Sequence, residues 1–161
     1  MRGKARNARR HRNLRLRGLA ALCALGLALS AVALDIREKT QLEFGGIATG
    51  PSSGPVTLAP TGGVSCGVHT CLGGAAPSKI HIKKGERNSQ YSISYSTGDL
   101  LLQSGGSGTI PLQNLNDSAG GLLVTNGGGN AKFDIGGEIV VGPATPGGDY
   151  GGTYTIILEL Q

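Results

Sequence analysis

The stretch Tyr154-Thr-Ile-Ile-Leu-Glu-Leu160, close to the end of the chain, decides the fold class. Two polar residues, Thr155 and Glu159, fall on one face of an extended segment, and an apolar series falls on the other: Tyr154, Ile156, Leu158 and Leu160. Successive side chains of a β-strand point to opposite sides, so this period of two predicts a strand with one buried face.

The same alternation recurs along the chain, for example in Lys-Ile-His-Ile-Lys over 79–83 and Tyr-Ser-Ile-Ser-Tyr over 91–95. Turn clusters rich in Gly and Pro separate these runs, and the 29 glycines disfavour long helices. Short strands at such spacing, with polar alternate positions, are typical of an antiparallel sandwich. We therefore expect one all-β domain over residues 34–161, an antiparallel β-sandwich of about seven to nine strands.

The beginning of the chain predicts a secretory signal peptide over residues 1–33. Eight Arg and Lys residues and no acid occupy the first seventeen positions, an uncharged Leu/Ala run follows over 19–34, and Ala31-Val-Ala33 supplies a small-x-small end. The apolar run is shorter than the roughly 20 residues of a membrane span, so we expect cleavage and no stable span afterwards.

Removing this segment reverses the charge of the protein. The full chain carries +5, whereas residues 34–161 hold seven Lys and Arg and ten Asp and Glu, a net charge of −3. A mature chain of this sign lacks the electrostatic signature of a nucleic-acid-binding protein, and we expect no nucleic acid among its partners.

Cys66 and Cys71 flank the most reactive cluster of side chains, Cys-Gly-Val-His-Thr-Cys. In an oxidising compartment this pair predicts a disulfide that closes a small loop, with His69 a bystander at the tip. A zinc site would need four ligands, and the cluster offers only this set with His81 as a distant fourth. The spacing excludes a Cys-x-x-Cys redox centre. We expect no metal and no cofactor.

Two further motifs are interpreted as structural rather than functional. Gly50-Pro-Ser-Ser-Gly54 matches the Gly-x-Ser-x-Gly of hydrolases, but that motif needs a helix after the serine and none is predicted here. Asn114, Asn116, Asp117 and Ser118 lack the Gly-centred loop of a calcium site and are typical of a turn. We therefore expect no enzymatic activity, and a secreted hydrolase is the least favoured function.

Several motifs taken in order resemble a known family: Gln-Leu-Glu-Phe-Gly-Gly-Ile, Val-Thr-Leu-Ala-Pro-Thr-Gly-Gly-Val, Tyr-Ser-Ile-Ser-Tyr, Phe-Asp-Ile-Gly-Gly-Glu-Ile-Val-Val and the closing Pro-Gly-Gly-Asp-Tyr-Gly-Gly-Thr-Tyr-Thr-Ile-Ile-Leu-Glu-Leu. Together they resemble a proteobacterial secreted domain family of unknown function, itself similar to pilin and spore-coat-protein-U-like subunits. The resemblance implies an immunoglobulin-like, pilin-type fold, no catalytic residues, and a structural or adhesive role at the periplasm, cell surface or fimbrium of a Gram-negative bacterium.

Pilin-type subunits assemble by β-strand complementation, with a periplasmic chaperone and an outer-membrane usher as partners and other copies as neighbours. The candidate assembly strands carry eight apolar residues: Leu34, Ile36, Leu42, Phe44, Tyr154, Ile156, Leu158 and Leu160. Residues 34–44 are either a donated strand or the first strand of a complete domain. The alternative function is a monomeric periplasmic or extracellular module that binds a carbohydrate or small ligand.

Overall fold

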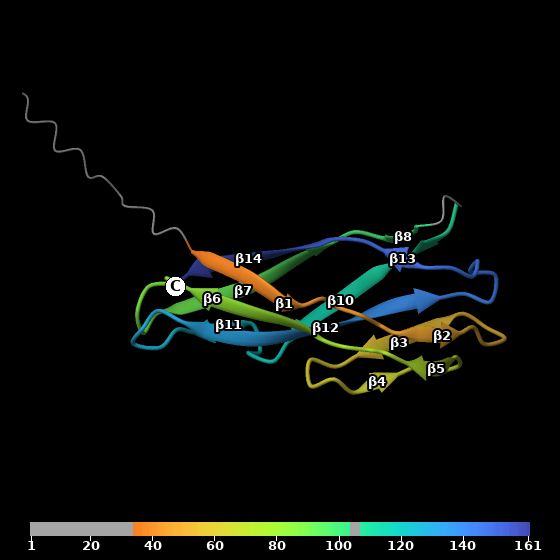
Figure 1. The fold of residues 1–161 in the computed structure, drawn as a ribbon, viewed down its shortest axis with the longest axis horizontal. Helices are drawn as coiled ribbons and strands as arrows, with labels where there is room; N and C mark the ends of the chain where they lie inside the picture. Colours follow the sequence, from red (N-terminus) through yellow and green to blue (C-terminus); the bar gives the residue numbers. More distant parts are fainter. Residues whose placement is uncertain (1–33, 104–106) are drawn as a thin grey trace, which may run out of the picture. The chain divides into compact units, whose positions relative to one another are not determined.

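The protein folds as antiparallel β-structure (Figure 1). The computed structural model describes residues 34–103 and 107–161; the predicted signal peptide over 1–33 lies outside the described residues. Within these two ranges there are fourteen strands and no helix, hence no helix long and apolar enough to cross a membrane. The predicted all-β fold class is confirmed.

The fourteen strands exceed the seven to nine expected, because short strands add to the long ones. Seven have five residues or more: β1 (Asp35–Thr40), β3 (Gly54–Leu58), β6 (Ser78–Lys83), β7 (Gln90–Thr97), β10 (Leu112–Asp117), β12 (Ala131–Val141) and β14 (Tyr154–Leu160). The others have two to four residues: β2 (Gly46–Ala48), β4 (Val64–Ser65), β5 (Thr70–Gly73), β8 (Leu100–Leu102), β9 (Thr109–Ile110), β11 (Leu122–Val124) and β13 (Tyr150–Gly151).

Two sheets form the sandwich. The large sheet has the order β1-β6-β12-β3-β4, with β10 also paired to β12, and the β7 sheet has the order β11-β7-β14. One buried cluster contains residues of both sheets, including Ile80 and Phe133 from the large sheet and Tyr91 and Ile93 from β7. The sheets therefore pack face to face through a shared core.

The long strand β12 organises the large sheet. Its residues 131–135 pair with β6 and its residues 137–141 with β3, both antiparallel, so β3 and β6 run in the same direction along consecutive parts of one strand. Residues 59–77, which contain the predicted disulfide, form an excursion between them. The odd-numbered residues of β12 contact both core clusters, Phe133 and Ile135 in the first and Ile139 and Val141 in the second.

Two adjacent glycines in β12 permit close approaches on its two faces. A Cβ on Gly136 would lie 2.1 Å from the carbonyl oxygen of Leu58, where the chain leaves β3. A Cβ on Gly137 would lie 2.6 Å from Leu115 Cδ2. A bulge in β10 at Asn114, whose φ is 51°, precedes Leu115, and Leu115 packs against both clusters. The described residues belong to a single compact unit.

The close approach at Gly136 yields a stability prediction. Gly136→Ala should lower the free energy of unfolding by about 2–4 kcal/mol, because the new methyl group meets backbone that has little freedom to move. Gly63→Ala is the matched control, since a Cβ there has no atom within 4 Å; its effect should stay within about 0.5 kcal/mol. Urea unfolding of both variants tests this, and equal stabilities would contradict the packing described.

Candidate functional site

A groove of about 1040 Å³ lies among the described residues. One wall is formed by residues 41–49, after β1, and the other by residues 145–152, around β13. The floor consists of apolar side chains from β8, β9, β10 and β12: Leu100, Ile110, Leu112, Ile139 and Val141. Four of these five belong to the buried residues of the second core cluster, so the groove opens directly onto the core.

The walls are held by sparse backbone pairing. Gly45 has a φ of 74°, and a Cβ there would lie 2.3 Å from the carbonyl oxygen of Gly73, so only glycine lets the two segments approach this closely. In the part of the chain that the structure describes, β2 pairs only with β5 and β13 only with β8. Each wall therefore contains a short strand paired along one side.

The rim of the groove is acidic. Its described lining residues include Glu38, Glu43 and Asp149 and no Lys or Arg. The Glu38 carboxylate accepts hydrogen bonds from the hydroxyl groups of Ser78 (2.7 Å) and Tyr154 (2.8 Å), which joins β1, β6 and β14 at one end of the groove.

The Tyr154 hydroxyl stays protonated at this junction. Burial raises the pKa of Tyr154 to about 12, and the nearby Glu38 carboxylate acts in the same direction, against the hydrogen bond with Ser78. The phenol is therefore a hydrogen-bond donor throughout the physiological pH range.

The eight predicted assembly residues lie in three different environments. Three of them line the groove: Leu42, Phe44 and Tyr154. Leu34, Ile156 and Leu158 pack against the first core cluster. Ile36 and Leu160 are exposed, by 42% and 53%. The first strand, β1, pairs with β6 of its own chain.

Sequence reasoning missed the second wall of the groove. The sequence of residues 145–152 predicts a glycine-rich turn. Only Tyr150 distinguishes this segment from an ordinary loop. The Tyr150 side chain packs against the second core cluster and donates a hydrogen bond to the carbonyl of Pro146 (2.8 Å). An aromatic residue inside a glycine cluster was the one available signal.

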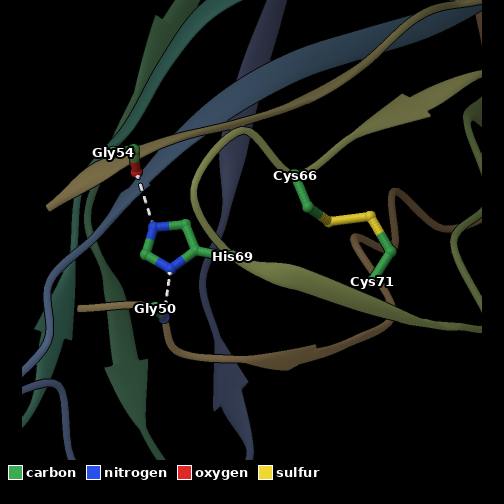
Figure 2. The surroundings of a disulfide bond; sticks show 5 residues. All are labelled: Gly50, Gly54, Cys66, His69 and Cys71. Carbon is green, nitrogen blue, oxygen red and sulfur yellow. Dashed lines mark hydrogen bonds between the residues drawn. A yellow bond between two sulfur atoms is a disulfide. The ribbon is translucent and has the colours of Figure 1, made fainter. Parts of the chain in front are cut away.

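The predicted disulfide is present (Figure 2). Cys66 and Cys71 are joined with a Cα–Cα distance of 5.7 Å, an ordinary separation for this bond. Cys66 is buried in the second core cluster, whereas Cys71 lies at the surface in β5. The bond thus links the exposed strand β5 to a core residue within the 59–77 excursion. No group of three or more His, Cys, Asp or Glu suited to a metal ion occurs among the described residues.

The expectation for His69 was wrong, because His69 is buried rather than a bystander at the loop tip. Its Nδ1 accepts a hydrogen bond from the backbone N–H of Gly50 (2.9 Å), so its Nε2 carries the proton and donates to the carbonyl of Gly54 (3.2 Å). Figure 2 shows the ring between these two backbone groups, directed away from the disulfide. His69 therefore connects the disulfide loop to the start of β3.

The remaining motifs have structural roles. Gly54 begins β3, and a Cβ on Gly50 would collide with the carbonyl oxygen of Val68 at 2.0 Å, so these glycines allow close packing of two loops. The strand-to-helix turn of a nucleophilic serine does not occur there in the described chain. Asn114, Asn116 and Asp117 lie in β10 rather than in the expected turn, because β10 pairs with β12. The turn follows them, and there Asp117 Oδ1 accepts from the N–H groups of Ala119 and Gly121.

Comparison with known proteins identifies the family of this chain. The model of the family described as Domain of unknown function (DUF4402) matches residues 34–159, and the chain belongs to that family. This confirms the family of unknown function that the ordered motifs indicate. No curated protein and no solved structure shows a significant match.

The bridging role of His69 gives a second prediction. His69→Phe should lower the free energy of unfolding by about 1–3 kcal/mol, because Gly50 N–H and Gly54 C=O each lose a buried partner. His81→Ala, a histidine change on the outer face of the large sheet, should cost no more than about 0.5 kcal/mol. Chemical denaturation with the disulfide intact measures both; a His69 variant as stable as the His81 variant would contradict the bridge.

Proposed function

We propose that residues 34–161 form an exported structural or adhesive subunit of the bacterial surface, which assembles by β-strand insertion into the groove. The observation that carries this proposal is the open groove itself. Its floor consists of core residues such as Ile110 and Ile139, and it lies between two walls that each contain a short strand paired along one side.

An extended segment of another copy fits these requirements. Its backbone would pair with free strand edges, and its alternate side chains would cover the apolar floor, the two components of recognition by β-strand addition. The volume lies at the upper limit of the roughly 300–1,000 Å³ of small-ligand pockets, which favours a peptide segment over a small molecule.

The proposed cellular setting follows from the predicted signal peptide and the resemblance to pilin-type subunits. The subunit would reach the periplasm of a Gram-negative bacterium, where a chaperone and an outer-membrane usher would act as partners before surface assembly. The proposed role needs no catalytic residue and no cofactor, and the net charge of −3 over residues 34–161 disfavours nucleic acid as a partner.

One observation favours the alternative of a monomeric carbohydrate-binding or small-ligand-binding module. The first strand, β1, already pairs with β6 of the same chain, so the large sheet is complete at that edge without a donated strand. In this alternative, the Tyr150 and Asp149 side chains at the groove would contact a sugar rather than a peptide.

Blocking the groove tests the proposal. Gly147 lines the groove, and a Cβ there has no atom within 4 Å, so Gly147→Arg should fold normally and place a bulky side chain in the opening. We expect wild-type protein in surface shear fractions to form filaments or SDS-resistant oligomers, and Gly147→Arg to abolish them. Electron microscopy and unheated SDS gels of those fractions provide the measurement.

The matched control is Gly63→Arg, an equally open glycine that is not among the groove lining residues. It should assemble as wild type, and both variants should show wild-type thermal unfolding. Normal assembly of Gly147→Arg would overturn the proposal. A wild-type monomer that binds a glycan saturably, and loses this binding in Gly147→Arg, would establish the alternative.

A further inference from the structure

A surface distinct from the groove carries most of the positive charge. Five cationic side chains lie on strands β1, β6 and β12 around His81, and we call them the cationic face: Arg37, Lys39, Lys79, Lys83 and Lys132. All five are exposed to solvent. Their neighbours of opposite parity on β6 and β12, such as Ile80 and Phe133, point into the core, so the cationic face lies on the outer surface of the large sheet.

Strand register brings these side chains together from distant parts of the sequence. Arg37 and Lys132 are the cross-strand partners of His81 on its two sides. Lys79 and Lys83 lie two residues before and after His81 on the same strand. Neighbouring strands are about 4.8 Å apart and alternate residues about 6.6 Å apart, so the positive charges form a flat array.

The charge of this array is opposite to that of the rest of the protein. On β1, β6 and residues 131–135 of β12, the outer surface holds five of the seven Lys and Arg residues of 34–161 and two acids, Asp35 and Asp134, a net charge of +3. Glu138 lies further along the same surface of β12, where it bonds to Gln113 and Thr57. The remaining residues of 34–161 carry −6. Asp35 forms a salt bridge with Arg37 at 2.9 Å. Such an exposed ion pair is weak, so the Arg37 guanidinium can still bind a ligand.

We infer that the cationic face binds a linear acidic polysaccharide, with carboxylate or sulfate groups at intervals along its length. A flat array of separated cations matches a chain that presents repeated anionic groups, and each contact is a charge-assisted hydrogen bond of the kind that Lys and Arg form best. This inference does not depend on the proposed assembly through the groove.

The composition of the cationic face disfavours two other polyanions. A membrane surface is held by apolar side chains as well as charge, and the outward positions of β1 and β6 are occupied by Asp35, Arg37, Lys79, His81 and Lys83, none of them apolar. Single-stranded nucleic acid needs aromatic side chains for base stacking, and these outward positions provide only the imidazole ring of His81.

His81 makes the expected binding sensitive to pH. Partial desolvation and the nearby Lys132, Lys39 and Lys83 lower the pKa of His81, while Asp134 opposes them weakly. The imidazole is therefore mostly neutral at pH 7 and gains charge as the pH falls. The pKa of Asp35 is lowered by Arg37, with Lys84 and Lys83 adding to the effect, so this carboxylate remains ionised near pH 5. Acidification thus adds positive charge to the cationic face.

Titration calorimetry with heparin as the probe and dextran as the neutral control tests this inference on the exported protein, after mass spectrometry has confirmed the loss of residues 1–33. We expect saturable, salt-sensitive binding to heparin at about 50 mM salt, where charge contacts are only partly screened. We expect no binding to dextran. Lys132→Glu should weaken heparin binding about tenfold. Arg87→Glu, the same charge change off the cationic face, should alter it by no more than about twofold.

The pH dependence of binding distinguishes a specific site around His81 from non-specific charge attraction. Wild-type affinity should increase from pH 7 to pH 5, and His81→Gln should remove most of that increase while it binds normally at pH 7. Equal losses in Lys132→Glu and Arg87→Glu, or no heparin binding, would overturn the inference. Tighter binding to anionic vesicles or single-stranded DNA than to heparin would overturn the choice of polysaccharide. Gly147→Arg should bind heparin as wild type, which keeps failure here distinguishable from failure of the groove proposal.

Discussion

The strand β12 is the constraint on which the rest of the structure depends. This one strand pairs with β6, β3 and β10 and supplies side chains to both core clusters. This strand requires two glycines at its centre, because Gly136 is in close contact with the chain that leaves β3 and Gly137 is in close contact with Leu115. Side chains at these positions would force apart the elements that β12 holds together.

The groove is a consequence of how unevenly the two halves of β12 are covered. The β7 sheet closes over the half that contains Phe133 and Ile135, whereas short strands and glycine-rich segments cover the half that contains Ile139 and Val141. Two-residue and three-residue strands provide few backbone hydrogen bonds, so this cover is held by sparse pairing. A groove over the core, between strands paired along one side, is the arrangement that an added strand stabilises.

Local patterns in the sequence predicted the strands but not their partners. The alternation in Tyr154–Leu160 was sufficient to predict β14, and the predicted export made the Cys66–Cys71 disulfide the expected state of that pair. The bond between His69 and the backbone of Gly50 and Gly54, the wall at 145–152, and the approach of Lys132 to His81 all depend on pairing between distant segments. Such long-range register leaves no periodic signal in a single sequence.

The central claim is that the groove accepts a strand, and backbone amide hydrogen exchange measures this most directly. Exchange of Ile47 in β2 and Gly151 in β13 should be compared between the purified monomer and the assembled surface material, with Ile80 in the core as the internal reference. Insertion predicts at least about tenfold slower exchange at one or both wall strands on assembly, with Ile80 unchanged. Unchanged exchange at both walls in assembled material would contradict the claim.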